Sequence, residues 1–302
     1  MIFEPFTLKG VTFKNRLLRS SMGGRLAYYD GTINGAWKNF ELSFAEGGVA
    51  GLISATLNVG PQRWSPLEYP QLSNDKFVKP LADGIRRIHA LDCRYIIQIG
   101  DAGYHTQTSL FSQAQDEKSA SNGFDLLYGY RNVRRAMTIG EVEHLVEQFG
   151  DAARRVRETG ADGVEITASK GYVLQQFLNP AVNHRADRYG GSTEKRFQLL
   201  KEVVTEARAQ IGDDRLLGVR LSANDCNNHA VNLRLPLRRP LREHRTGNGI
   251  DVSLTYAKWL KELGVDYLLI TNGFGFTNAK EQPGDFPLPE VKMFFNSTRH
   301  LS

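Results

Sequence analysis

The side chains best placed for chemistry lie in the segment 162–196, DGVEITASKGYVLQQFLNPAVNHRADRYGGSTEKR. Lys170 and Tyr172 follow its apolar opening, GVEIT. In enzymes built on parallel strands, reactive groups stand at the carboxyl ends of those strands. A lysine there can form a Schiff base with a carbonyl substrate when its pKa is depressed. A lyase or aldolase that uses Lys170 is therefore one alternative, which borohydride trapping with a carbonyl substrate would test.

The sequence lacks the residue spacings that metal, iron–sulfur and dinucleotide sites need. The seven histidines form no H-x-x-x-H pair and no Cys/His spacing, which predicts no metal site. Cys93 and Cys226 are too few for a disulfide framework or a four-thiolate cluster, which favours a reducing compartment. Neither Met22-Gly-Gly nor Asn272-Gly-Phe-Gly-Phe276 supplies the third glycine of a dinucleotide-binding fingerprint, and no Walker A sequence occurs.

Composition and charge are typical of a soluble globular protein. Of the 302 residues 41% are hydrophobic, and 38 Lys and Arg face 33 Asp and Glu, which excludes intrinsic disorder. The chain has no signal-peptide core and no run of about 18 apolar residues, so we predict a cytoplasmic protein without membrane contact. The excess positive charge lies mostly in an arginine run without interleaved aromatics, which predicts a solvated or phosphate-contacting loop and no nucleic-acid site. The run comprises Arg234, Arg238, Arg239, Arg242 and Arg245.

Short aliphatic runs alternate with helical patterns along the chain. Thr138 and Glu141 form a capping box that opens one helix, and helices are predicted over 138–160, 192–212 and about 251–264. Regular strand–helix repetition without a nucleotide fingerprint favours a TIM (β/α)8 barrel over a doubly wound sheet. The predicted buried strands are LLRSS (17–21), GLISA (51–55), YIIQI (95–99), GVEIT (163–167), LGVRL (217–221) and YLLIT (267–271).

The number of predicted strands is too small for a closed barrel. Six strands are complete at Thr271, and residues 272–302 are too few for two further strand–helix units of about 30 residues each. We therefore expect one α/β domain over residues 1–302, an incomplete TIM barrel with about six of its eight units. This expectation describes a fragment or a truncated reading frame.

Segment 162–196 closely resembles the signature of the Old Yellow Enzyme / NADH:flavin oxidoreductase family, D-G-V-E-I-H-x-A-H/N-G-Y-L-x-x-Q-F-L-S-P followed by N-x-R-x-D-x-Y-G-G-S. The resemblance extends from Phe3 to about Phe276 and implies a TIM barrel that holds FMN at the carboxyl ends of its strands, with NAD(P)H as electron donor. Further landmarks in the family's order are LKGVTFKNRLLRSSM (8–22), EGGVAGLI (46–53), IIQIGDAG (96–103) and GVRLS (218–222).

The resemblance implies a flavin site made by several strand ends. Arg220 would stabilise the negative charge that reduced flavin carries near N1 and the C2 carbonyl. Gln98 offers both a donor and an acceptor to the pyrimidine edge of the ring. Further contacts are implied for the backbone of Ser21, Met22 and Gly23, with Ala55 or Thr56 beside them.

The same alignment implies the catalytic residues. Tyr172 matches the family's proton donor and, with a pKa of about 10, holds a proton at neutral pH for the α-carbon of the reduced alkene. The family's histidine pair, which binds the substrate carbonyl, falls on Thr167 and Lys170, which could donate a neutral hydrogen bond and a point charge. Gly23 stands where relatives carry a Cys or Thr that touches the flavin. The dienoyl-CoA reductase branch also lacks the histidine pair and uses a histidine where this sequence has Thr277.

We therefore predict an FMN-dependent NAD(P)H oxidoreductase that reduces an activated C=C bond of a small molecule. The sequence is compatible with a homo-oligomer. The alternative is a truncated, catalytically inactive barrel remnant with weak or no flavin binding, because loops after strands seven and eight usually hold the phosphate in such barrels. Arg185 and Asp187 are predicted to form a structural ion pair beside the Gly190-Gly191 turn.

Overall fold

The computed structural model describes residues 1–61, 69–105, 118–127, 130–225 and 247–273. Its centre is a sheet of parallel strands: β3 (Leu18–Arg19), β4 (Gly51–Ile53), β5 (Leu57–Asn58), β6 (Arg94–Gly100), β10 (Gly163–Ala168), β11 (Leu216–Ser222) and β12 (Tyr267–Thr271). The main path through the sheet runs β12-β11-β10-β6-β4-β3, and β5 pairs with β6 beside it. Along this path the strands follow one another in the order in which they occur in the chain, as strand–helix repetition predicts.

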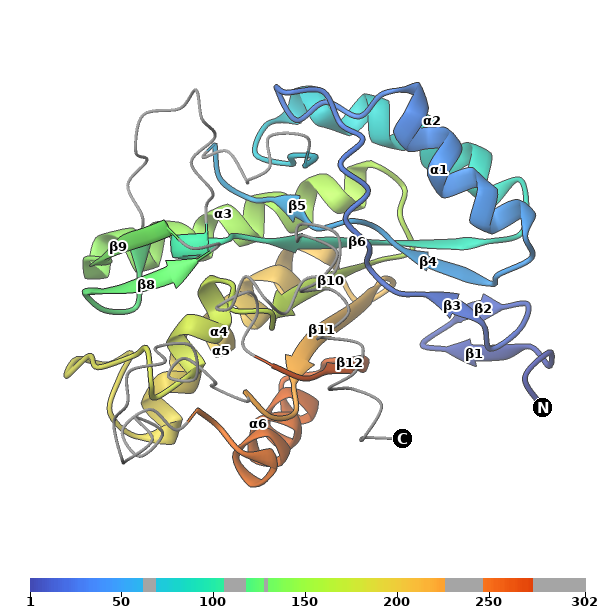
Figure 1. Cartoon of the computed structure of the whole chain (residues 1–302). Coiled ribbons are helices and arrows are strands. Elements are labelled where there is room, and N and C mark those ends of the chain that lie inside the picture. The colour runs from blue at the N-terminus through green and yellow to red at the C-terminus, as the bar shows by residue number, and fades with distance from the viewer. Residues whose placement is uncertain (62–68, 106–117, 128–129, 226–246, 274–302) are drawn as a thin grey trace, which may run out of the picture.

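Helices pack against one face of the sheet and form the larger hydrophobic core (Figure 1). They are α1 (Gly35–Glu46), α2 (Val78–His89), α3 (Ile139–Glu158), α5 (Thr193–Ile211) and α6 (Ile250–Glu262). Alternate strand residues such as Tyr95, Ile97 and Val164 point into this core and are fully buried. The residues between them, at positions 96, 98 and 165, therefore point to the other face, which is the inside of the barrel.

The described part of the chain confirms the predicted strands and helices. Each of the six predicted runs overlaps a strand, although the strand in the first run is only the two residues of β3. Thr138 caps α3, and the reciprocal Thr138–Glu141 capping box is present. Ser192 caps α5 through the backbone amide of Lys195. The arginine run and Thr277 lie outside the described residues, so the predictions for them stay predictions.

A hairpin closes the amino-terminal end of the barrel interior. Strands β1 (Phe6–Leu8) and β2 (Val11–Phe13) pair antiparallel, and Phe6 and Phe13 stack with ring centroids 4.8 Å apart. Lys9 and Gly10 turn the chain with φ of 43° and 81°. The hairpin packs on Ile96 and other residues at the starts of the strands, forming a second, smaller apolar cluster. The base of the barrel is therefore filled with apolar side chains.

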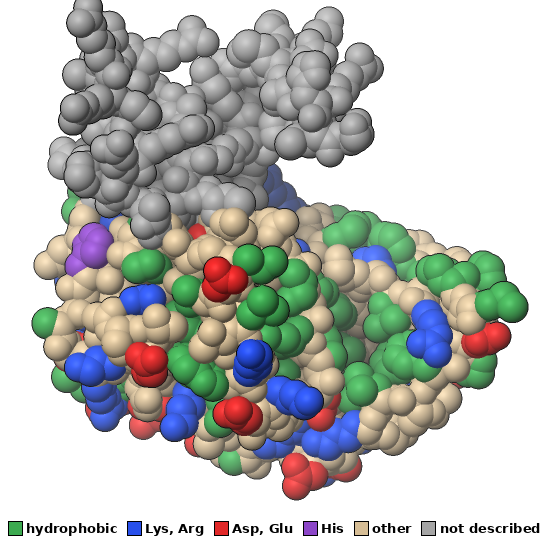
Figure 2. Space-filling model, turned by 90° about the horizontal axis from the view of Figure 1, so that it is seen from below, with side chains coloured by type: hydrophobic (Ala, Val, Ile, Leu, Met, Phe, Trp, Pro, Cys, Tyr) green, Lys and Arg blue, Asp and Glu red, His purple; other side chains and the backbone are tan. Residues whose placement is uncertain are grey.

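The described sheet is an open part of a barrel. Among the described strands, β3 and β12 each pair on one side only. Ile270 on β12 is 56% exposed, whereas all but one residue of β11 are buried. Figure 2 looks at the molecule from below, the side of α6, and shows apolar side chains between mixed positive and negative charges. The two open edges of the described sheet agree with the predicted incomplete α/β barrel.

Small elements lie beyond the carboxyl ends of the strands. Two single turns of 3-10 helix span Asp75–Phe77 and Gly103–His105. Strands β7 (Lys118–Ser119), β8 (Gly123–Leu127) and β9 (Tyr130–Ala136) form a separate three-stranded sheet. The short helix α4 (Val173–Leu178) follows β10 after a four-residue loop and is buried throughout. Sequence analysis did not predict these elements.

Candidate active site

The inner face of the sheet becomes polar towards the carboxyl ends of its strands. The β-ladder aligns Gln98 of β6 with Glu165 of β10, and Glu165 in turn with Gly218 of β11. Gly218 is aligned with Tyr267 of β12. One layer nearer the carboxyl ends, Thr167 of β10 lies beside Arg220 of β11. The sheet thus brings the predicted residues Gln98, Thr167 and Arg220 to one face of neighbouring strands.

A chain of hydrogen bonds fixes the amide of Gln98, which is fully buried. The hydroxyl groups of Ser21 and Thr56 both donate to its Oε1, the first at 3.0 Å. Its Nε2 donates to Glu165 Oε1 at 2.6 Å. The oxygen therefore accepts two hydrogen bonds and the amide nitrogen keeps one hydrogen for a further acceptor.

Glu165 is the centre of this chain, and sequence analysis did not select it. Its second oxygen accepts a hydrogen bond from the Tyr267 hydroxyl at 3.0 Å. Burial raises the pKa of Glu165, while its hydrogen bonds to Gln98 and Tyr267 and the Arg220 charge act against that rise. Burial and the neighbouring Glu165 raise the pKa of Tyr267 well above its ordinary value. The phenol therefore stays protonated and donates to the carboxylate.

The layer nearer the carboxyl ends holds donors without acceptors. Thr167 is 1% exposed, and its Oγ1 has no hydrogen-bond partner among the described residues. The Nε of Arg220 is likewise buried and without a partner there. Buried polar atoms in folded proteins nearly always find a partner, so two neighbouring exceptions on one face indicate a place for a ligand.

Lys170 stands in the loop between β10 and α4 with an uncommon backbone conformation. Its φ is 59°, and that of Gly171 is 75°, so two successive residues adopt the left-handed region. The Lys170 ammonium donates to the carbonyl oxygen of Asn272, after β12, at 3.5 Å. Burial, followed by the Arg220 guanidinium, lowers the pKa of Lys170. The side chain of Lys170 is half-buried.

Tyr172 is the N-cap residue of α4. Its backbone amide donates to Ser169 at 3.2 Å, and its carbonyl accepts from the amide of Gln176 at 2.9 Å. The side chain of Gln176 donates to the carbonyls of Ala102 and Gly171, at 3.0 and 2.7 Å, which ties this loop to the end of β6. Backbone hydrogen bonds therefore hold Tyr172 at the carboxyl ends of the strands, which form the rim of the barrel. Its predicted role as proton donor stays a prediction.

Gln175 ties the same loop to the ends of β11 and β12. It accepts from the amide of Gly171 at 2.6 Å and donates to Asp225 at 2.6 Å and to the carbonyl of Gly273 at 3.2 Å. Asp225 also accepts from the amide of Asn248 at 2.7 Å. Burial raises the pKa of Asp225 to about 6. The only signal for these contacts in the sequence is the Gln-Gln pair that follows Tyr172 by three residues.

The remaining predicted cofactor contacts lie at the ends of β3 and β4. Ala55 and Thr56 are buried, while Met22 is 43% exposed. A Cβ atom added to Gly23 would collide with the Tyr69 hydroxyl. The Tyr69 phenol thus occupies the space that a side chain at position 23 would take, and burial raises its pKa. This accounts for glycine at a position where the family resemblance implies a Cys or Thr.

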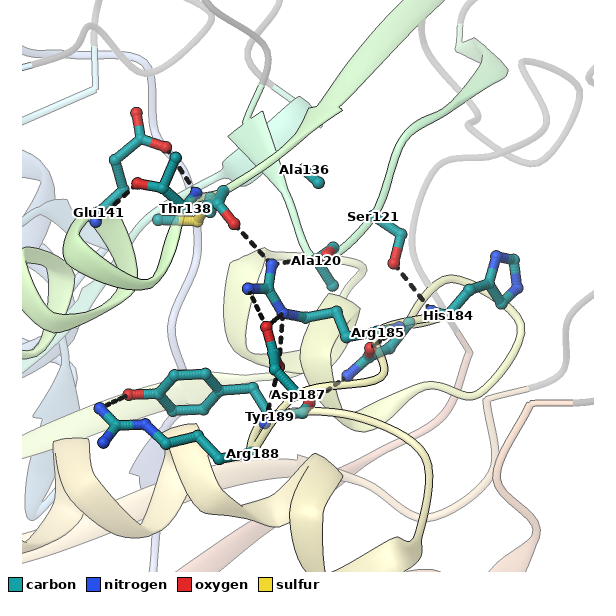
Figure 3. A network of polar contacts seen from close by, with 12 residues as sticks. Ala120, Ser121, Ala136, Thr138, Glu141, His184, Arg185, Asp187, Arg188 and Tyr189 are labelled. Atoms are coloured by element: carbon teal, nitrogen blue, oxygen red, sulfur yellow. Dashed lines mark hydrogen bonds and ion pairs between the residues drawn. The ribbon is translucent and has the colours of Figure 1, made fainter.

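A buried arginine braces the loop that follows α4. Figure 3 shows the Arg185 guanidinium between the carboxylate of Asp187 and the backbone of two other segments. It lies 2.6 Å from Asp187 Oδ2 and donates to the carbonyls of Ala120 and Met137 at 3.1 and 2.6 Å. Asp187 also accepts from the amide of Tyr189 at 3.0 Å. The predicted structural ion pair is confirmed, and it joins this loop to the three-stranded sheet and to the start of α3.

Two further features, a cluster of metal ligands and a membrane-crossing helix, are not found in the described part of the chain. No three His, Cys, Asp or Glu side chains there gather as ligands for a metal ion. Nor does any helix in the described ranges have the length and apolar character needed to cross a membrane.

Comparison with known protein families gives one match over most of the chain. Residues 1–233 match the profile of the family described as NADH:flavin oxidoreductase / NADH oxidase. A probable NADH-dependent flavin oxidoreductase of Bacillus subtilis, YqiG, is 34% identical over 229 residues, which are 74% of this chain and 60% of that protein. An NADPH dehydrogenase of the same organism is 30% identical over 280 residues, covering 90% of this chain and 73% of that one. The aligned chain thus spans less than two thirds of the first relative.

Solved structures show the same fold. A 2-naphthoyl-CoA reductase superposes with a TM-score of 0.81 at 21% identity, covering 98% of this chain and 44% of the other. The Old Yellow Enzyme homologue of Zymomonas mobilis gives a TM-score of 0.73 at 23% identity, covering 97% and 79%. These likenesses confirm the predicted TIM-barrel architecture, of which the described strands form a part.

Proposed function

The chain belongs to the NADH:flavin oxidoreductase / NADH oxidase family, and from this premise we propose that it reduces an activated C=C bond of a small molecule. The family's members are oxidoreductases that use FMN with NADH or NADPH, as the resemblance in the sequence predicted. The overall change we propose converts an electron-poor alkene, NAD(P)H and a proton into the saturated product and NAD(P)+. FMN, when bound, supplies the redox chemistry that links donor and alkene.

The donors on the inner face fit a flavin ring. The pyrimidine edge of FMN consists of acceptors and one N–H, and it gains negative charge on reduction. Gln98 retains one amide hydrogen beyond its bond to Glu165, and Arg220 adds a fixed positive charge one layer above. These two side chains would hold the pyrimidine edge, with backbone groups of Ser21, Met22 and Gly23 and either Ala55 or Thr56 beside it.

Three residues at the end of β10 and in the loop that follows it would act on the substrate: Thr167, Lys170 and Tyr172. The Thr167 hydroxyl, which has no partner among the described residues, would donate to the carbonyl oxygen that activates the alkene. The Lys170 charge would stabilise the negative charge that develops on this oxygen. Tyr172 would then give a proton to the α-carbon, a role suited to a phenol that is protonated at neutral pH.

The observation that carries this proposal is the pair of unpartnered donors on the inner face, Thr167 Oγ1 and Arg220 Nε. The test is a titration of the full chain with FMN, followed by visible absorbance. We expect a yellow protein that bleaches anaerobically with NADH or NADPH. A protein that stays colourless after FMN is added would contradict the proposal and favour the alternative, a barrel remnant that binds no flavin. The predicted cytoplasmic location and homo-oligomer stay predictions.

A further inference from the structure

A buried ion pair lies beside the ends of β3 and β4. Arg19, the last residue of β3, is 8% exposed, and Glu41 of α1 is fully buried. The Nη2 of Arg19 donates to Glu41 Oε2. The guanidinium carbon lies over the rings of Phe40 and Phe44 on the same helix, 5.8 and 4.8 Å from their centroids. The helix α1 thus holds the Arg19 charge on the helix-covered face of the sheet.

The same guanidinium joins two strand ends. Its Nη1 donates to the carbonyl oxygen of Ile53, the last residue of β4, at 3.0 Å, and to that of Ser20 at 3.4 Å. Among the described strands, the two residues of β3 pair only with β4, so backbone pairing fixes little of the chain that follows. That chain is residues 21–23, and residues 55–56 follow β4. Arg19 therefore cross-links the two segments to which flavin contacts are assigned.

Stability alone does not explain an ion pair at this place. Taking both charges out of water costs free energy, and apolar side chains of similar volume often stabilise a protein equally well or better. Arginine instead carries several N–H donors in one rigid plane. Because Glu41 accepts from Nη2, it fixes the direction in which Nη1 points at the two carbonyl groups. The pair is thus suited to set the positions of strand ends.

We propose that the Arg19–Glu41 pair positions the ends of β3 and β4 to bind FMN, and that it does so only while Glu41 carries its negative charge. This role deepens the proposed function and rests on it. Both are positioning residues, since they act through backbone carbonyl groups from the helix-covered face. Ser20 also precedes Ser21, whose hydroxyl donates to Gln98 Oε1 at 3.0 Å. A displacement at Ser20 would therefore reach the Gln98 amide as well.

The charge of Glu41 changes near neutral pH, while its neighbours keep theirs. Burial raises the pKa of Glu41 to about 7, and the Arg19 charge, the Arg19 hydrogen bond and the Tyr95 hydroxyl act against that rise. Burial also raises the pKa of Tyr95, on β6, well above its ordinary value, and that of Cys93 to about 12, so both stay neutral. Arginine stays charged. Between pH 6 and pH 8, Glu41 is therefore the group of this cluster that titrates.

The experiment is a titration of the full chain with FMN at pH 6 and at pH 8, followed by quenching of flavin fluorescence. About a tenth of Glu41 is ionised at pH 6 and about nine-tenths at pH 8. The ratio of wild-type to Glu41→Gln affinity should therefore be about tenfold larger at pH 8 than at pH 6. The FMN phosphate also titrates near pH 6, but this contribution is common to both proteins. Glu46→Gln, at an exposed carboxylate of the same helix, should behave as the wild type.

A double variant separates the positioning role from folding. Arg19→Met alone would leave Glu41 buried without its cation, whereas Arg19→Met together with Glu41→Gln removes both charges. The double variant should bind FMN as weakly as Glu41→Gln at both pH values, with folding checked by urea denaturation. If it does not fold, the pH dependence of Glu41→Gln decides alone.

Two results would overturn the positioning role while leaving the proposed function intact. One is an affinity ratio that is the same at pH 6 and pH 8. The other is a folded double variant that binds FMN as tightly as the wild type at pH 8. A chain that takes up no FMN at either pH would contradict the proposed function together with the role of the pair.

Discussion

The two ends of the barrel interior differ in whether the side chains there find all of their packing and hydrogen-bond partners within the protein. At the base, the β1–β2 hairpin and the starts of the strands form an apolar cluster in which Phe13 is 1% exposed. At the rim, the same strands present Gln98, Glu165 and Arg220, and two buried donors have no partner among the described residues. In TIM barrels the base serves stability and the rim serves chemistry. In this chain the change from base to rim takes place within single strands. On β6, Ile96 belongs to the apolar cluster at the base, and Gln98, two residues later, belongs to the polar layer at the rim.

Removal of the Tyr172 hydroxyl should have the largest effect and should act on chemistry alone. Tyr172→Phe is expected to slow the reduction of cyclohexenone by about 10² to 10⁴-fold, the usual contribution of a general acid. Anaerobic bleaching of the flavin by NADPH should keep its rate, because that half of the reaction needs no proton from Tyr172. Stopped-flow absorbance separates the two. Tyr29→Phe, on a tyrosine that is 65% exposed, is the control. Equal slowing of both halves would contradict the assigned role.

A cavity at the base should change stability and leave the rim intact. Phe13→Ala removes a ring that stacks on Phe6 and lies close against Gly51. We expect a loss of about 3 to 4 kcal/mol in the free energy of unfolding, measured by urea denaturation. Phe3→Ala, at a side chain that is 74% exposed, should cost less than about 0.5 kcal/mol. The folded fraction of Phe13→Ala should bind FMN as the wild type does. A weaker affinity with unchanged stability would break the division between base and rim.

The strands could be predicted because each is a short run of apolar residues, and their order followed from strand–helix repetition. Local signals also predicted the Thr138–Glu141 capping box and the Arg185–Asp187 pair, whose partners are close in sequence. The bond from Gln98 to Glu165 could not be predicted in this way, because it spans 67 residues and depends on the register of two strands. The hairpin that closes the base was missed because strands of three residues give little periodicity.

The burial of Asp225, which lies against Gln175 and Asn248, should make the stability of the rim depend on pH. Burial raises the pKa of Asp225 from 3.8 to about 6, so its contribution to stability is complete below pH 4 and is lost as pH rises through 6. Asp225→Asn resembles the protonated form at every pH. Between pH 4 and 7, the difference in unfolding free energy between variant and wild type should change by up to about 3 kcal/mol. Chemical denaturation of both proteins across this range is the measurement, and parallel curves would refute the expectation.

The smallest effect is expected from a change that keeps the shape of the rim but alters the orientation of Gln98. In Glu165→Gln, one acceptor of the buried carboxylate becomes a donor, so either the Gln98 amide or the Tyr267 hydroxyl loses its acceptor. If Gln98 rotates in response, the donor that it offers to FMN is lost as well. We expect FMN to bind about tenfold more weakly, equivalent to roughly 1.4 kcal/mol. Tyr267→Phe leaves Gln98 bonded to Glu165 and should change the FMN affinity less. If both variants weaken FMN equally, Glu165 acts through general packing and does not position Gln98, and the polar layer at the rim would then be structural, as the base is.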